Sequence, residues 1–138
     1  KCIQSAVSNV NDHIFLIEDG YESTLSRVVN KSTQTSIKIP CYTMLDILSK
    51  FPNFRKVDIV SIDVEGHEYE VLEGMPIADF YTKLLIIESD KSQIEELKKL
   101  NFLCDYKPII SNGINTFCTH KKENLRIPNQ LPEGFSFL

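Results

Sequence analysis

Long apolar runs, paired cysteines and an excess of basic residues are all missing from this sequence of 138 residues. No stretch approaches the roughly 18 consecutive apolar residues that a membrane-spanning helix requires, so no membrane span is expected. Acids and bases are interspersed at a formal net charge of -4, which gives no basic face for a phosphate backbone. Nucleic acid is therefore not an expected partner.

The cysteines lack the CxxC spacing of zinc sites, and they are too few and too scattered for a dense disulfide framework. Cysteine is among the residue types most often found buried. We therefore predict four reduced thiols in the core of a cytoplasmic protein. A pairing of two of them across a hairpin stays a minor alternative. The four are Cys2, Cys41, Cys104 and Cys118, and the two that a hairpin would bring together are Cys104 and Cys118.

Composition predicts an ordinary globular domain, because 42% of the residues are hydrophobic and 25% are charged. We expect a domain over residues 1–122 and a C-terminal tail over residues 123–138, where prolines and a glycine interrupt any periodicity. The chain opens at Lys1 within a strand-like pattern and without a signal segment, so we expect that an upstream segment precedes it.

The pattern of apolar residues changes near Thr43. Before it, short strands separated by polar turns are expected at residues 2–7, 13–17, 25–29 and 36–39. Thr43 itself is a candidate N-cap, and the following apolar residues recur at helical spacing until Pro52.

The second half of the chain alternates strands and helices. Residues 57–62 are almost continuously apolar and β-branched, which is typical of a strand covered on both faces. The acidic turn 63–66 and a helix over residues 67–74 follow, with Tyr69, Val71, Leu72 and Met75 as its apolar residues. A second strand and helix come at residues 84–88 and 91–100, and two strands at residues 102–110 and 114–120 flank an Asn-Gly turn. This order predicts an α/β sheet, mostly parallel, with an antiparallel C-terminal hairpin.

Ligands of open α/β sheets bind at the carboxyl ends of the strands, where this chain carries acidic residues and a histidine. The spacing permits a hard cation site, or His67 as a general base toward a hydroxyl, and requires neither. Three further acids on the helix are expected to form a solvated face. The residues at the strand ends are Asp63, Glu65, His67 and Glu88, and those on the solvated face are Glu68, Glu70 and Glu73.

Residues 57–74, VDIVSIDVEGHEYEVLEG, resemble the signature of FkbM-type methyltransferases. Supporting matches occur in the family's order along residues 1–120. They are AVSN at residues 6–9, TMLD at 43–46, LIIE at 85–88 and NTF at 115–117.

The resemblance implies a Rossmann-like sheet that binds S-adenosylmethionine (SAM) and transfers its methyl group to a hydroxyl on a sugar, polyketide or lipid-linked acceptor. It places Ser8, Asn9 and Asp63 at the cofactor. It also makes Asp63, Glu65 and His67 the catalytic set, with Asp63 nearest the reacting methyl group and the other two on the substrate side.

The sequence departs from the family in several places. Ser61 stands where a lysine is frequent, and the first strand with its glycine-rich turn and the acid for the ribose are absent. The sheet would then be truncated at its N-terminal side, with an exposed edge that promotes homo-oligomers. Two other functions stay open: a non-catalytic remnant that binds a protein through this edge and the tail 135–138, or a metal-dependent hydrolase built on the acidic turn.

Overall fold

The computed structural model describes residues 2–18, 26–29, 31–53, 56–76 and 80–138, which divide into two compact units. The first unit comprises residues 1–51 and 64–75, and the second comprises residues 52–63 and 76–138. Each unit contains its own sheet. Within the described ranges, no helix has the length and apolar character needed to cross a membrane.

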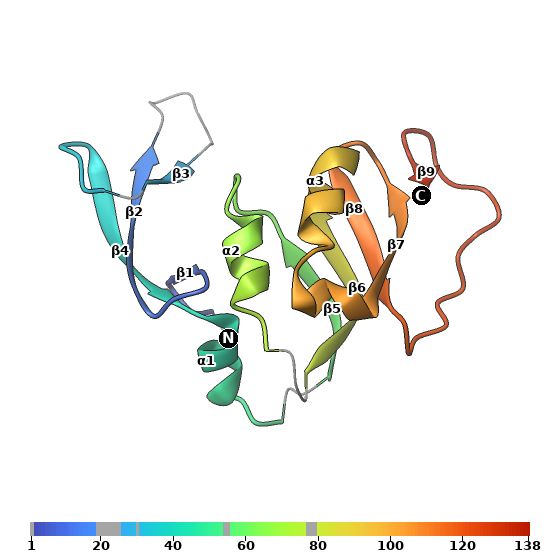
Figure 1. Cartoon of the computed structure of the whole chain (residues 1–138), viewed down its shortest axis with the longest axis horizontal. Helices are drawn as coiled ribbons and strands as arrows, with labels where there is room; N and C mark the ends of the chain where they lie inside the picture. The colour runs from blue at the N-terminus through green and yellow to red at the C-terminus, as the bar shows by residue number, and fades with distance from the viewer. Residues whose placement is uncertain (1, 19–25, 30, 54–55, 77–79) are drawn as a thin grey trace. The chain divides into compact units, whose positions relative to one another are not determined.

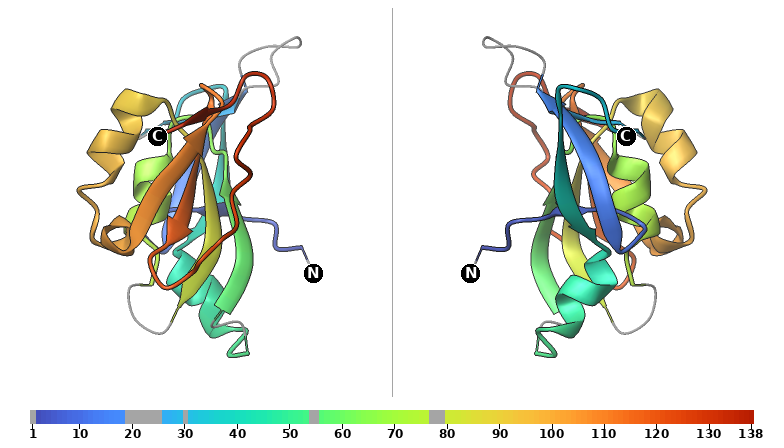
Figure 2. Two further views of the ribbon diagram at one scale, coloured as in Figure 1. Left: turned by 90° about the vertical axis from the view of Figure 1, so that its right-hand side faces the viewer. Right: turned by 90° about the vertical axis from the view of Figure 1, so that its left-hand side faces the viewer.

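The first unit is built on a four-stranded sheet in the order β1-β4-β2-β3. Here β2 pairs antiparallel with both β3 and β4, and β1 adds a short parallel pairing to β4 (Figures 1 and 2). The strands predicted at residues 13–17 and 36–39 are confirmed, whereas only the last two residues of the predicted strand 2–7 pair with a neighbouring strand. The bounds are β1 (Ala6–Val7), β2 (Asp12–Glu18), β3 (Ser26–Val29) and β4 (Ser36–Tyr42). Residue 25 of the predicted strand 25–29 lies outside the described residues.

Two short helices belong to the same unit. Helix α1 (Met44–Ser49) begins where predicted, because the Thr43 hydroxyl accepts the backbone N–H of Asp46 at 3.2 Å. Helix α2 (Glu68–Glu73) follows the acidic turn. On α2 the buried apolar side chains are Val71 and Leu72, whereas Tyr69 is 46% exposed.

The second unit is built on a five-stranded sheet in the order β5-β6-β8-β7-β9. The pair β5–β6 is parallel, and β8 runs antiparallel between β6 and β7 (Figure 1). The tail returns to this sheet, because β9 pairs antiparallel with β7. The bounds are β5 (Lys56–Ile62), β6 (Tyr81–Glu88), β7 (Tyr106–Ser111), β8 (Asn115–His120) and β9 (Ser136–Phe137).

The mostly parallel sheet predicted from the sequence is not confirmed. The described strands form two sheets, and only the pairs β1–β4 and β5–β6 are parallel. Parallel neighbours need a long crossover connection, and the chain supplies a helix between β5 and β6, whereas the turn between β7 and β8 is tight. The structure is therefore a mixed α/β arrangement rich in strands.

Strand β5 also differs from its prediction. Its pattern predicts burial on both faces, yet Ile59 is 57% exposed and only Ile62 is buried. The reason is position, because β5 is the edge strand of its sheet and pairs on one side only among the described strands.

The core of the second unit lies between the sheet and helix α3 (Lys91–Leu97), which covers one face of it (Figures 1 and 2). Leu85 and Ile87 of β6 are fully buried, and Ile94 contributes from the helix. The helix is well capped, since the Asp90 carboxylate accepts the backbone N–H of Gln93 at 2.9 Å while the Gln93 side chain accepts that of Asp90 at 2.8 Å. A 3-10 turn, η1 (Asn101–Asp105), occupies the start of the strand predicted over residues 102–110.

The C-terminal hairpin is confirmed. The turn between β7 and β8 is closed by the backbone bond from the Asn112 N–H to the Asn115 carbonyl at 3.2 Å. Gly113 has a φ of 87°, which only glycine adopts without cost. The Asn112 side chain also accepts the backbone N–H groups of Ile114 and Asn115. The Asn-Gly pair thus forms the turn that it predicts.

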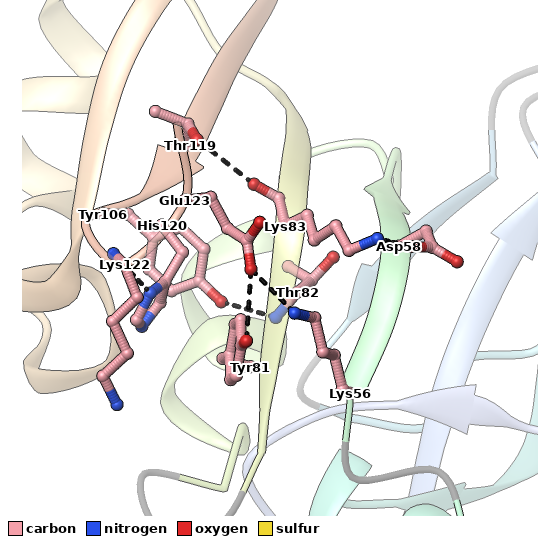
Figure 3. A network of polar contacts seen from close by, with 10 residues as sticks. All are labelled: Lys56, Asp58, Tyr81, Thr82, Lys83, Tyr106, Thr119, His120, Lys122 and Glu123. Atoms are coloured by element: carbon pink, nitrogen blue, oxygen red, sulfur yellow. Dashed lines mark hydrogen bonds and ion pairs between the residues drawn. The ribbon is translucent and has the colours of Figure 1, made fainter. Parts of the chain in front are cut away.

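A polar and aromatic cluster joins the tail to the sheet of the second unit (Figure 3). Glu123 accepts hydrogen bonds from the Lys56 ammonium at 2.9 Å and from the Tyr81 hydroxyl at 3.1 Å. The hydrogen bond of Lys56 to Tyr81, followed by that to Glu123, raises the pKa of Lys56, and the Lys56 ammonium lowers the pKa of Glu123. Residue 123, where the tail is expected to begin, is therefore tied to β5 and β6.

His120 is the buried centre of this cluster (Figure 3). Its ring lies 4.5 Å from the Tyr81 ring and 5.0 Å from the Tyr106 ring, measured between centroids. Its Nδ1 accepts the backbone N–H of Lys122 at 3.1 Å, so this nitrogen carries no proton. Burial lowers the pKa of His120 and raises that of Tyr106 to about 12.

All four cysteines are free, as predicted, and two of them lie in the core. Cys41 and Cys118 are buried, whereas Cys2 and Cys104 are exposed. Burial raises the pKa of the Cys118 thiol to about 12, so this thiol stays protonated and inert.

Candidate functional site

The acidic turn after β5 has an unusual backbone. Glu65 has a φ of 54° and Gly66 a φ of 92°, both in the left-handed region. Glutamate rarely adopts this conformation, and such residues concentrate at functional sites. The side chains of Asp63 and Glu65 are both exposed.

Glu68 holds the turn in this shape. Its carboxylate oxygen Oε1 accepts the backbone N–H groups of Val64 and Gly66, each at 3.2 Å. The residue is only 7% exposed, so the prediction that Glu68 belongs to a solvated helix face is wrong. The physical reason is that two backbone donors of the tight turn need an acceptor, and the first residue of α2 supplies it.

Ser8 lies directly after β1 and is 2% exposed. Its backbone N–H donates to the Tyr42 carbonyl at 3.0 Å, which extends the pairing of β1 with β4. Its hydroxyl Oγ lies 2.8 Å from Nε2 of His67, at hydrogen-bond distance. The buried Cys41 thiol, whose pKa burial raises and the Ser8 hydrogen bond partly lowers, also contacts this hydroxyl.

Asn9 continues the contact between the β1 end and α2. Its Oδ1 lies 3.2 Å from the Ser8 hydroxyl, and its Nδ2 donates to Glu73 Oε2 at 2.6 Å. Glu73 fixes the orientation of the amide, because a carboxylate accepts from its NH₂ group and so leaves Oδ1 facing the Ser8 hydroxyl.

His67 has a neighbour at each ring nitrogen. Nε2 faces Ser8, and Nδ1 lies 3.4 Å from Oε2 of Glu70. The His67 side chain is 14% exposed and that of Glu70 39% exposed. The imidazole is therefore largely enclosed between a hydroxyl and a carboxylate.

Close approach of two backbones completes the arrangement at Gly74. A Cβ at this position would lie 2.2 Å from the carbonyl oxygen of Ser8, a distance that real Cβ atoms do not show. The Gly74 carbonyl in turn accepts the backbone N–H of Leu45 at 3.4 Å. Glycine at the end of α2 thus permits the contact with the segment after β1.

The structure brings together three of the predicted site residues, Ser8, Asn9 and His67, within the first unit. Glu65 belongs to the same unit and Asp63 to the second one. The sequence reasoning missed Glu70 and Glu73 as parts of the site. The signal was present, because His67, Glu70 and Glu73 recur at intervals of three along one helix.

A protein-family model described as the methyltransferase FkbM domain matches residues 4–110, more than three quarters of the chain. The chain belongs to the FkbM methyltransferase domain family. The resemblance predicted from residues 57–74 is therefore confirmed, and the matched range contains all five predicted site residues. The search of curated proteins and that of solved structures returned no match.

Proposed function

We propose that this FkbM-family chain takes part in the SAM-dependent methylation of a hydroxyl on a sugar, polyketide or lipid-linked acceptor. The observation that supports it best is the 2.8 Å contact between Ser8 Oγ and His67 Nε2. This contact joins the segment expected at the cofactor to His67, which directly follows the acidic turn 63–66, although the two lie far apart in the sequence. Removal of a proton from a hydroxyl requires a positioned base, and a histidine beside the cofactor segment can serve as that base.

The residues offer chemistry that fits SAM. The nucleoside carries a cationic sulfonium, an amino group and sugar hydroxyls, and exposed carboxylates and amides are suitable partners for these groups. Asn9, Asp63 and Glu65 are exposed and present such groups. Ser8, expected at the cofactor, has a buried side chain and acts through its hydrogen bonds to Asn9 and His67. SAM itself supplies an electrophilic methyl group when bound.

In this proposal Asp63, Glu65 and His67 form the catalytic set. The exposed carboxylates of Asp63 and Glu65 stabilise positive charge and bind acceptor hydroxyls. His67 takes the proton that the acceptor hydroxyl loses, because imidazole is the side chain best suited to accept a proton near neutral pH.

We also infer the wider organisation from the same family. Residues 1–122 form the methyltransferase domain with a Rossmann-like sheet, and residues 123–138 are an appended tail. The parallel β5–β6 pair and the C-terminal hairpin support such a sheet. The free thiols support a cytoplasmic location, and the edge strand β5 supports a homo-oligomer.

Methyl transfer can be tested with SAM labelled in its methyl group and a panel of hydroxyl-bearing sugars, polyketides and lipid-linked glycans. We expect label in a hydroxylated acceptor, and we expect Asp63→Ala to abolish it while the thermal unfolding temperature stays unchanged. Asp58→Ala is the matched control, because Asp58 is an exposed aspartate of the strand that precedes the turn. A fully active Asp63→Ala protein would contradict the catalytic role assigned to this carboxylate.

A further inference from the structure

The hydrogen bonds around His67 carry a more specific inference, which rests on the proposed function. We call Ser8, Asn9, His67 and Glu70 the His67 network. All four belong to the first unit, and they come in two pairs, Ser8 with Asn9 and His67 with Glu70, from segments about 60 residues apart in the chain. The question is where protons sit in this network, since each ring nitrogen of His67 has one specific neighbour.

In the neutral imidazole one nitrogen carries a proton and the other has a lone pair. The Glu70 carboxylate, 3.4 Å from Nδ1, favours the proton on Nδ1, because a lone pair facing a carboxylate is repelled. The lone pair is then on Nε2, where it accepts the Ser8 hydroxyl at 2.8 Å. The neutral network is therefore complete with the proton on Nδ1.

In the protonated imidazole both nitrogens donate. Nδ1 forms an ion pair with Glu70, and Nε2 now donates to Ser8 Oγ. The hydroxyl proton of Ser8 must turn elsewhere, and Asn9 Oδ1 lies 3.2 Å from Oγ to accept it. Glu73 keeps Asn9 in this orientation by accepting from its Nδ2 at 2.6 Å. The Ser8 hydroxyl thus has an acceptor in both protonation states, His67 Nε2 in the neutral one and Asn9 Oδ1 in the charged one.

Other titratable groups around the network do not disturb this exchange. On α2, Glu73 accepts from the amide nitrogen of Asn9. On β4, the Cys41 thiol contacts Ser8, and its pKa is raised by burial, so it remains a neutral thiol. Glu70 is then the charged group that sets the proton position on His67.

Each ring nitrogen of His67 has a polar neighbour, and the neighbour of Nε2 is the Ser8 hydroxyl, through which a proton can reach it. We propose that Ser8 passes the proton of the acceptor hydroxyl to His67, and that Glu70 is a positioning residue that keeps Nε2 as the accepting nitrogen. The Ser8 hydroxyl is buried, but its neighbour Asn9 is exposed. The acceptor oxygen therefore reaches Ser8 by taking the place of Asn9 Oδ1.

The step balances in atoms and electrons. The acceptor oxygen forms its bond to the methyl carbon, and the electron pair of the broken carbon–sulfur bond stays on sulfur. The acceptor O–H bond breaks and its proton goes to Ser8 Oγ, while the original Ser8 proton goes to Nε2 of His67. Serine ends as a neutral hydroxyl and His67 as an imidazolium beside Glu70.

The first arm of the test needs no methyl transfer. Nitrogen NMR of the full chain, labelled with ¹⁵N-histidine, distinguishes the two neutral tautomers of His67. We expect the proton on Nδ1 in the unsubstituted protein and a loss of that preference in Glu70→Gln. Glu133→Gln, at an exposed glutamate of the tail, should leave it unchanged. A proton on Nε2 in the unsubstituted neutral protein would overturn the assigned role of Glu70, whether or not the chain is a methyltransferase.

The second arm tests whether Ser8 and His67 act in series. Ser8→Ala and His67→Gln should each lower the rate of methyl transfer about a hundredfold or more, and the double variant should lose no more than either alone. Independent, multiplying losses in folded variants would overturn the relay. Absence of transfer in the unsubstituted protein, with the expected tautomer, would refute the proposed reaction while supporting the position that Glu70 gives to the proton.

Discussion

Glu68 shows how a single side chain shapes the acidic turn 63–66. Its carboxylate is the acceptor for two backbone N–H groups, and it does so from a buried position. The residue therefore supports the left-handed backbone at Glu65 and Gly66. In the sequence it looks like one more acid in a run of acids, and only the backbone geometry of the turn reveals its separate role.

Replacing Glu68 by alanine should lower the free energy of unfolding by about 1–3 kcal/mol, because two backbone donors lose their acceptor in a buried place. Glu68→Gln retains an oxygen at the same position and should lose less. Urea denaturation followed by circular dichroism measures both. An alanine variant as stable as the unsubstituted protein would mean that water replaces the carboxylate without cost.

His120 makes stability depend on pH in a definite direction. Burial lowers its pKa in the folded protein, whereas an unfolded histidine titrates near about 6.5. The unfolded chain therefore binds more protons as the pH falls through that value, so the free energy of unfolding should fall between about pH 7 and pH 5. Above the unfolded pKa this contribution is fully present.

The variant His120→Asn isolates this effect. Its side-chain oxygen can still accept the backbone N–H of Lys122, but it does not titrate. We expect lower stability at pH 7, from the lost ring contacts, and a weaker dependence on pH in the same interval. The lowered pKa values of Asp58, Asp90 and Glu123 act in a more acidic window, since their stabilisation is lost as the pH falls below about pH 5. An unchanged slope in urea midpoints against pH would refute the role given to His120.

At the residue scale the sequence predicts which residues belong to the site better than it predicts which residues contact one another. The DxEG turn and His67 stand out because charged residues directly follow an apolar strand. The partnership of Ser8 with His67 could not be predicted from spacing, because 59 positions separate the two residues and only the fold brings them together. Glu70 was within reach of prediction, since residues three apart on a helix are neighbours.

At the scale of elements, the contact between α2 and the segment after β1 depends on one glycine. Gly74 has an ordinary φ of -80°, so its role is not conformational. The space is what matters, because a Cβ would meet the Ser8 carbonyl at 2.2 Å and backbone cannot give way as a side chain can.

Gly74→Ala should therefore destabilise the protein by about 1–3 kcal/mol, although alanine normally stabilises a helix relative to glycine. Amide exchange at Ser8 and Asn9 should accelerate as their contact with α2 loosens. Gly134→Ala serves as the comparison, because a Cβ there meets open space and only its φ of 84° is unfavourable. A Gly74→Ala protein that is more stable than the unsubstituted one would contradict the close approach.

Elements with local signals were predicted correctly. The cap at Thr43 and the Asn112-Gly113 turn each depend on neighbouring residues, and both are present. The burial of β5 on both faces was predicted wrongly and the mostly parallel sheet was not confirmed, because both depend on which strand pairs with which. An apolar strand such as β5 has the same sequence whether it is central or at an edge, and its exposed Ile59 records that it is at the edge.

At the scale of the whole molecule, the range matched by the family model ends inside the sheet of the second unit. The match ends at residue 110, within β7. Strand β8 follows it in the sequence but lies between β6 and β7 in the sheet, and it pairs with both. The fold of the second unit therefore requires residues beyond the matched range, and the tail is tied to the same sheet through Glu123 and β9.

The central proposal is that this FkbM-family chain binds SAM, and that Asn9 and Asp63 are each needed for full affinity. Calorimetric titration of SAM and of S-adenosylhomocysteine into the purified chain tests it most directly. The account predicts saturable binding of one ligand per chain, weakened by Asn9→Ala and by Asp63→Ala and unchanged by Glu133→Gln. A folded protein that gives no binding heat at several temperatures, or one whose affinity is indifferent to Asn9 and Asp63, would contradict it.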